Sequence, residues 1–167
     1  MKKGLTLIVL TVLLNLPLPT MAADIFLVRH AEKQVDGTSD PALTQAGLKR
    51  ASDLADLLAS AEIQHVYTSD YRRTRLTAAP SALQAGVELK SYEISELTEL
   101  ARTLSSLKQN VLVVGHSNTT PELVKLLGGD AGSDIPEWQY DRVYLVRIND
   151  QRAVDTVLLH LQPLSKE

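Results

Sequence analysis

The sequence predicts a three-layer α/β/α sandwich with a mainly parallel sheet. Short apolar runs of strand length alternate with longer segments whose apolar residues recur every three or four positions, which is typical of a sheet covered by helices on both faces. The length of 167 residues fits one domain with a substantial core. Hydrophobic residues make up 44% of the chain, an ordinary globular composition.

The N-terminal segment, residues 1–23, has the pattern of a secretory signal peptide. A basic start, Met1–Lys3, precedes the uncharged and largely apolar stretch Gly4–Ala23. The small residues at the end of this stretch favour cleavage after Ala22 or Ala23. We therefore expect a secreted protein that is released into the periplasm.

A membrane anchor is the alternative interpretation of this segment. Its unbroken apolar run ends at Leu14, well short of the roughly 20 residues that span a bilayer. The chain has no cysteine, so it carries neither a lipoprotein signal nor a disulfide. We expect one domain over residues 24–167, without a stable membrane anchor once the signal peptide is removed.

The charge of the chain argues against nucleic acid as a partner. The formal net charge is −3 at pH 7, and this value still includes Lys2 and Lys3 of the signal peptide. A nucleic-acid-binding domain usually shows a strongly basic face. We expect no nucleic-acid partner, and we expect the local basic clusters to serve local purposes.

The first elements of the domain are a strand, a polar loop and a helix. A buried strand is predicted over Asp24–Arg29, because its middle, Ile25–Val28, is an apolar run. A helix is predicted over Thr44–Ser60, because Ala51, Leu54 and Leu58 recur with the spacing of one buried helix face. Thr44 is a suitable N-cap residue.

The middle of the chain continues the alternation. A short strand is predicted over His65–Ser69, followed by a helix that begins near Tyr71 and that Pro80 breaks or kinks. The segment Val87–Tyr92 predicts a third strand, and Ile94–Leu107 the helix after it.

The clearest later strand is Asn110–Gly115, which is almost entirely apolar. The following helix has Pro121 near its first turn and Gly128 after its end, the usual positions of these residues. The last strands are predicted over Val143–Ile148 and Val154–Leu161, as an antiparallel pair joined by a turn at Asn149 and Asp150.

Cationic side chains and imidazoles follow several of these strands. Arg29 ends the first strand and His30 follows it. Ser69 ends the second strand, and Arg72 and Arg73 come shortly after it. His116 follows the fourth strand. In open α/β sheets ligands bind beyond the carboxyl ends of the parallel strands, so these groups are expected to meet at one edge. Arginine and histidine there suit a phosphoryl group, because guanidinium donors match its oxygens and an imidazole can attack phosphorus.

Four segments in order resemble the histidine phosphatase superfamily, which has the phosphoglycerate-mutase-like fold. They are LVRHAEK (27–33), LTQAGLKRA (43–51), YTSDYRRTRLTA (67–78) and VLVVGHSN (111–118). Ala31 stands where many members of the family have glycine. The resemblance implies a phosphatase of the histidine acid type that needs no metal and no cofactor and acts on a small phosphorylated substrate.

The resemblance also implies roles for individual residues. His30 would be the nucleophile that becomes phosphohistidine, and His116 the second histidine that donates to the phosphoryl group. Arg29 and Arg73 would bind the phosphoryl oxygens. Arg72 is the rival of Arg73 for that position.

The general acid is expected in the segment YEISELTEL, residues 92–100. Many members of the family supply a glutamate shortly after the third strand, and here Glu93, Glu96 and Glu99 are available. Glu96 fits the family's spacing best and is the predicted acid.

Two other functions fit parts of the sequence. The segment GHSNT, residues 115–119, follows a strand and opens a helix, so Ser117 could be the nucleophile of a serine hydrolase. Thr119 replaces the second glycine of that motif, however, and no acid-then-histidine order follows. A non-catalytic phosphate-binding module of the same fold is the other alternative.

A phosphatase is favoured over a mutase. A mutase must shield its phosphohistidine from water, and this chain has little room for the insertions that would do so. Export also separates it from glycolytic substrates. The substrate is expected to be a sugar phosphate of the periplasm or a phosphate of the lipopolysaccharide core.

The remaining charged residues are expected to be structural or solvated. His65 and His160 have no ligand spacing that would indicate a metal site. Glu32 and Lys33 are expected as a solvated loop pair. Surface positions are expected for five arginines in addition to Arg75: Arg50, Arg102, Arg142, Arg147 and Arg152.

Overall fold

The computed structural model describes residues 23–149 and 154–162. The predicted signal peptide therefore lies outside the described residues, apart from Ala23 at its end. Among the described helices, none combines the length and the apolar character that crossing a membrane requires.

One mixed sheet of six strands, in the order β3-β2-β4-β1-β5-β6, forms the middle of the described structure. The pairs β2–β3, β2–β4 and β1–β4 are parallel, whereas β5 is antiparallel to both β1 and β6. The mainly parallel sheet predicted from the sequence is confirmed. The strands are β1 (Ala23–Arg29), β2 (Ile63–Ser69), β3 (Leu89–Tyr92), β4 (Asn110–Gly115), β5 (Arg142–Ile148) and β6 (Val154–His160).

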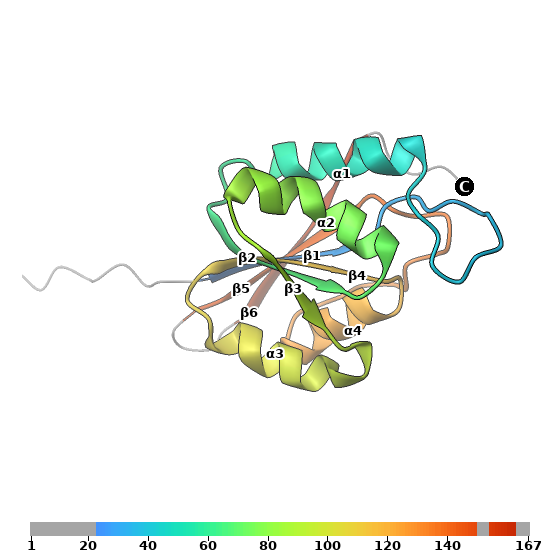
Figure 1. Cartoon of the computed structure of the whole chain (residues 1–167). Helices are drawn as coiled ribbons and strands as arrows, with labels where there is room; N and C mark the ends of the chain where they lie inside the picture. The colour runs from blue at the N-terminus through green and yellow to red at the C-terminus, as the bar shows by residue number, and fades with distance from the viewer. Residues whose placement is uncertain (1–22, 150–153, 163–167) are drawn as a thin grey trace, which may run out of the picture.

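Helices cover both faces of this sheet, as Figure 1 shows: α1 and α2 lie on one face, and α3 and α4 on the other. The three-layer architecture is thus confirmed. The helices are α1 (Gln45–Leu57), α2 (Arg72–Ala85), the short 3₁₀ helix η1 (Ile94–Glu96), α3 (Leu97–Ser106) and α4 (Thr119–Leu126).

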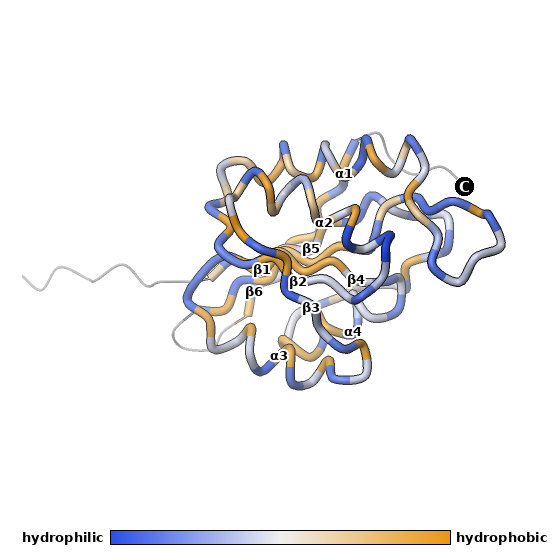
Figure 2. Tube along the Cα trace, viewed as in Figure 1, coloured by the Kyte–Doolittle hydropathy of each residue, from blue (hydrophilic) through white to orange (hydrophobic). Residues whose placement is uncertain are grey.

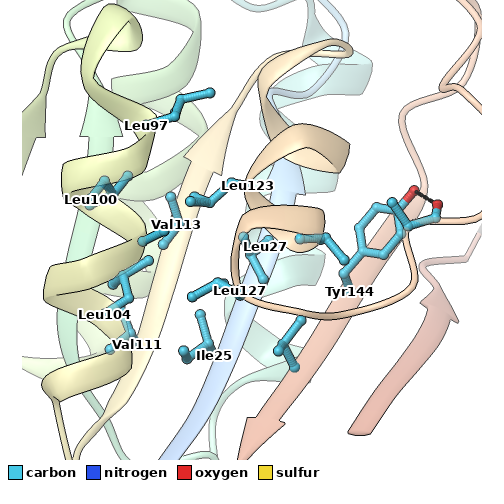
Figure 3. Packing of buried hydrophobic residues seen from close by; sticks show 14 of the residues in the cluster. Ile25, Leu27, Leu97, Leu100, Leu104, Val111, Val113, Leu123, Leu127 and Tyr144 are labelled. Carbon is cyan, nitrogen blue, oxygen red and sulfur yellow. Dashed lines mark hydrogen bonds between the residues drawn. The ribbon is translucent and has the colours of Figure 1, made fainter. Parts of the chain in front are cut away.

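Two hydrophobic cores result from the alternation of side chains along the strands. Ile25 and Leu27 of β1 belong to the core under α3 and α4, whereas Phe26 and Val28 belong to the core under α1 and α2. Figure 3 shows the first core, in which leucines of α3 and α4 pack on β4 and β1. Both faces of β1 are therefore buried, which is why its middle, Ile25–Val28, is apolar, and Figure 2 shows the same concentration of apolar residues in the sheet.

Several element boundaries differ from the sequence prediction. Pro80 does not end its helix, since α2 continues to Ala85 and buries residues on both sides of the proline. Packing on α1 and the sheet outweighs the one backbone hydrogen bond that proline cannot make. The helix predicted from Ile94 begins as the 3₁₀ turn η1 and becomes α-helical at Leu97. The predicted turn at Asn149 and Asp150 lies partly outside the described residues.

Candidate active site

The parallel pairing of β1 and β4 brings the two predicted site histidines together. Arg29 is aligned with Gly115, and the backbone N–H of His30 donates to the carbonyl of Gly115 at 2.9 Å. The residues that follow both strands therefore lie side by side, with the rings of His30 and His116 5.5 Å apart between centroids. The sequence had predicted that these two histidines lie close together at the carboxyl edge of the sheet.

A pocket of about 310 Å³ opens at this edge. Predicted site residues from β1, α2 and the loop after β4 line it together with residues that the sequence did not single out. The lining consists of Arg29, His30, Lys33, Tyr71, Arg73, Ile94, His116, Ser117, Asn118, Thr119 and Glu137.

His30 is buried and held in one tautomer. Its Nδ1 lies 2.8 Å from the carbonyl oxygen of Ala31, and because a carbonyl can only accept, Nδ1 carries the proton. The lone pair is then on Nε2. Burial lowers the pKa of His30 to about 3, with Arg29 adding to the effect and the hydrogen bond to Ala31 opposing it. His30 is therefore an uncharged imidazole at neutral pH, which is the form a nucleophile needs.

Hydroxyl groups orient His116. Its Nε2 lies 2.9 Å from the Oγ of Ser69. The Ser69 hydroxyl donates to the Oγ1 of Thr74 at 3.1 Å, and the Thr74 hydroxyl donates to the Ser69 carbonyl at 2.8 Å. Since the Ser69 proton is already engaged, Nε2 of His116 is the donor in the first contact. Burial lowers the pKa of His116 to about 4, with the charges of Arg73 and Arg29 contributing.

Arg29 is almost fully enclosed, with 3% of its surface exposed. Its Nη1 contacts the carbonyls of Pro136, Glu137 and Gln139 at 2.9 to 3.0 Å, and its Nη2 donates to the Glu137 carboxylate at 2.7 Å. The guanidinium also lies 4.2 Å from the centre of the Tyr140 ring. The loop between α4 and β5 thus holds the arginine beside His30.

Arg73, rather than its neighbours, lines the pocket. Its guanidinium lies over the Tyr71 ring at 4.2 Å, and its nearest carboxylate, that of Asp40, is 3.7 Å away. Arg72 is exposed, and Arg75 forms an exposed ion pair with Asp70. The geometry therefore agrees with the predicted register of the arginines.

The three predicted candidates for the general acid lie in different places. Glu96 is exposed in η1 and is not among the lining residues, and Glu99 is paired with Arg102 on α3. Glu93 lines a separate hollow that shares Tyr71 with the pocket. None of these contacts assigns the acid, and Glu96 stays a prediction.

Two residues that were expected to be solvated, Arg50 and Glu32, form a largely enclosed ion pair instead. Arg50 is buried rather than exposed, and its Nε and Nη2 donate to the carboxylate of Glu32 at 2.7 to 3.0 Å. This pair attaches the loop after β1 to α1.

A side chain at Gly47 would lie 2.3 Å from the Glu32 carbonyl, so only glycine allows α1 to approach this loop so closely. The carbonyl of Glu32 also accepts from the backbone N–H of Thr44, the N-cap of α1.

Sequence reasoning missed Glu137, Tyr140 and Tyr71 as site residues. Glu137 and Tyr140 lie in an irregular loop, where no periodicity marks the residues that face inward. The only signal available was the cluster of aromatic and charged residues in EWQYD, residues 137–141.

Ser117 does line the pocket, but within the described residues its hydroxyl makes no hydrogen bond to an imidazole of the kind that a serine hydrolase requires.

Comparison with known proteins agrees with this geometry. Residues 25–102 match the model of the histidine phosphatase superfamily (branch 1). The "Probable phosphoglycerate mutase GpmB" of Photorhabdus laumondii is 38% identical over 71 residues, and the GpmB of Yersinia enterocolitica shows the same identity over the same length. Each match covers 39% of this chain and 33% of the relative, so the chain spans about a third of the length of these relatives.

Solved structures cover more of the chain. The protein histidine phosphatase SixA complexed with tungstate superimposes with a TM-score of 0.67 at 17% identity, over 82% of this chain and 96% of that one. The alpha-ribazole phosphatase from Shigella flexneri gives 0.66 at 18% identity, over 86% and 99%. At such identities the likeness shows the fold.

The fold and the site thus define a phosphoglycerate-mutase-like α/β protein with paired histidines and arginines at one edge of its sheet. Residues 25–102 of the chain are similar to the histidine phosphatase superfamily, and the fold resembles that of phosphatases of known structure over most of the described chain.

Proposed function

We propose that this protein is a phosphomonoester hydrolase that acts through a phosphohistidine intermediate on His30. The observation that carries the proposal is the state of that residue. Its Nδ1 proton is bound to the Ala31 carbonyl and its pKa is lowered to about 3, so Nε2 has a free lone pair at neutral pH. The buried guanidinium of Arg29 and the largely buried one of Arg73 line the same pocket.

Both arginines retain hydrogen-bonding capacity for a phosphoryl group. Within the described residues, the Nε of Arg29 and the Nε of Arg73 are buried without a hydrogen-bond partner. An unmade bond of a buried charged donor is costly, so each guanidinium gains from an added acceptor. The side chain of Arg73 is also only 14% exposed, which strengthens its attraction for an anion compared with a solvated arginine.

The reaction proceeds in two displacements at phosphorus. The lone pair of His30 Nε2 attacks the phosphorus, an N–P bond forms, and the P–O bond to the leaving alcohol breaks. A water oxygen then attacks the phosphorus of phosphohistidine, its proton passes to the carboxylate that protonated the leaving alcohol, and the N–P bond breaks to release inorganic phosphate. Arg29 and Arg73 stabilise the charge on the phosphoryl oxygens in both transition states.

His116 would act on the same oxygens. In the free protein its Nε2 proton is engaged with Ser69, and its ring is uncharged. A bound phosphoryl dianion favours the charged imidazole, since an opposite charge nearby raises the pKa of a histidine. His116 would then donate from Nδ1 as well. The proton for the leaving alcohol is the task we predict for Glu96.

The substrate is proposed to be a sugar phosphate of the periplasm or a phosphate of the lipopolysaccharide core. Support comes from the signal-peptide pattern of residues 1–23, which would direct the domain out of the cytoplasm. The glucosyl-3-phosphoglycerate phosphatase of mycobacteria, whose structure superimposes with a TM-score of 0.61 at 13% identity, is named for a phosphorylated sugar derivative.

A screen of phosphomonoesters with the domain over residues 24–167 tests the proposal. We expect release of inorganic phosphate from p-nitrophenyl phosphate and from one or more sugar phosphates, and its loss in His30→Asn. Asparagine is uncharged and close in size to neutral histidine but cannot form phosphohistidine. Equal turnover by the His30→Asn variant would refute the proposed mechanism, and hydrolysis of none of the esters would refute the function.

A further inference from the structure

Glu137 holds a place in the pocket that the proposed reaction does not use. Its carboxylate accepts a hydrogen bond from Nη2 of Arg29 at 2.7 Å, and its other oxygen lies 4.0 Å from the Nζ of Lys33. The side chain of Glu137 is 71% exposed, whereas that of Arg29 is 2% exposed. A largely solvated carboxylate thus binds an enclosed guanidinium at the proposed phosphoryl site.

The carboxylate is not needed to position Arg29. The Nη1 of the arginine is already anchored by the backbone carbonyls of Pro136, Glu137 and Gln139 at 2.9 to 3.0 Å. The Tyr140 ring, 4.2 Å from the guanidinium, supports it further. These contacts come from the backbone and a neighbouring side chain, so they would remain if the Glu137 side chain moved away.

A carboxylate and a phosphoryl group compete for the same donors. A carboxylate presents two anionic oxygens and a tetrahedral phosphoryl group presents three, and in each case two of the oxygens can match the fork of a guanidinium. A phosphoryl group on Arg29 would also lie beside the negative charge of Glu137, and the two like charges would repel each other. Glu137 thus occupies one donor of Nη2 and repels a second anion at the remaining donors of Arg29, so the two anions compete for this guanidinium.

We propose that Glu137 is an internal competitor for Arg29, so that its carboxylate lowers the affinity of the site for a substrate phosphoryl group. The proposal rests on the proposed function of the pocket. Lys33, 31% exposed at the rim, is the cation near which the displaced carboxylate can remain.

The effect on affinity follows from charge. Any anion that binds Arg29 must displace the Glu137 carboxylate or bind beside its negative charge, and both cost free energy. Removing the carboxylate should therefore strengthen the binding of anions to the pocket.

The test is calorimetric binding of inorganic phosphate and of vanadate to the wild-type domain and to Glu137→Gln. The amide keeps the size of the side chain and removes its charge, and we expect both anions to bind about tenfold more tightly, the value of one charge-assisted hydrogen bond. Glu122→Gln is the matched control. Glu122 is exposed on α4 beside the pocket and does not line it, so the same change in net charge should leave binding within about twofold.

Each other outcome has a definite meaning. Unchanged or weaker binding by Glu137→Gln refutes the competition, and weaker binding would show that Glu137 positions Arg29 instead. A loss of turnover confined to alkyl phosphates, with unchanged anion binding, would refute it in favour of a role as general acid. If neither the folded wild type nor the folded variant binds phosphate or vanadate, the proposed function itself fails, and the competition with it.

Discussion

Replacing Arg73 by alanine is expected to lower kcat and kcat/KM together. The side chain of Arg73 lines the pocket, is 14% exposed and has its nearest carboxylate, that of Asp40, 3.7 Å away. Its charge is therefore only partly compensated in the free protein. An arginine that binds mainly the charge developing on the phosphoryl oxygens contributes more in the transition state than in the ground state.

The size of the effect follows from this environment. Two unit charges about 4 Å apart interact by about 4 kcal/mol at an effective dielectric constant near 20, which suits a group at the edge of a protein. Loss of one preorganised donor costs about 2.7–4 kcal/mol in other enzymes. At 1.36 kcal/mol for each factor of ten, we expect Arg73→Ala to lower kcat by about a hundredfold to a thousandfold.

The assay is steady-state hydrolysis of p-nitrophenyl phosphate, with thermal unfolding as a check on the fold. Arg72→Ala and Arg75→Ala are matched controls, since both arginines are exposed on the first turn of the same helix and neither lines the pocket. Each should stay within about tenfold of wild type, because surface substitutions have small effects.

Two results would refute this reasoning. If Arg72→Ala is as damaging as predicted for Arg73→Ala while Arg73→Ala is mild, the register of the arginines is wrong. If Arg73→Ala raises KM and leaves kcat unchanged, the arginine binds ground state and transition state equally and is not a transition-state donor.

Four further predictions concern the covalent intermediate, metals, pH and the acid. Rapid quenching during turnover should reveal an acid-labile, base-stable phosphoryl group on His30, and finding it on Ser117 would contradict the mechanism. Activity should survive exhaustive chelation and be inhibited by vanadate, and loss on chelation that one divalent metal reverses would contradict this. The pKa values of His30 and His116 are lowered to about 3 and about 4, so both rings should stay neutral by NMR at pH 5.5. Because the unfolded chain protonates histidine near pH 6.5, the free energy of unfolding by urea should decrease as the pH falls from about 6.5 toward about 4, and no decrease would contradict the burial of neutral rings. Glu96→Gln should slow hydrolysis of an alkyl phosphate far more than that of p-nitrophenyl phosphate, whose leaving group needs little protonation, and equal effects would direct the same test to Glu93.

The order of strands and helices could be predicted from the sequence because the signals are local. The apolar run in β1 indicates a strand buried on both faces. The spacing of Ala51 and Leu54 in α1 and of Leu58 at its C-cap indicates a helix buried on one face. The boundaries were less accurate, as at Pro80, because a residue with poor local propensity is retained where tertiary packing compensates for it.

The site could be located from the sequence for a related reason. His30 and His116 each follow an apolar strand, and the carboxyl ends of parallel strands meet at one edge of the sheet. The partners of these residues could not be found in this way. Glu137 is 108 positions from Arg29 and lies in a loop without periodicity, so no local pattern connects the two. The burial of Arg50 was missed for the same reason, since its partner Glu32 lies in another element.

The sequence by itself therefore determined the fold class, the edge of the sheet at which the candidate site lies and the residues that reach this edge. These three features follow from short-range periodicity and from the order of strands and helices along the chain. Only the tertiary structure decided the state of these residues. Whether an imidazole is neutral and which nitrogen carries its proton depend on burial and on single hydrogen bonds, such as those to Ala31 and Ser69. Contacts of this kind depend on distances below 3 Å between groups that the chain brings together only when it has folded.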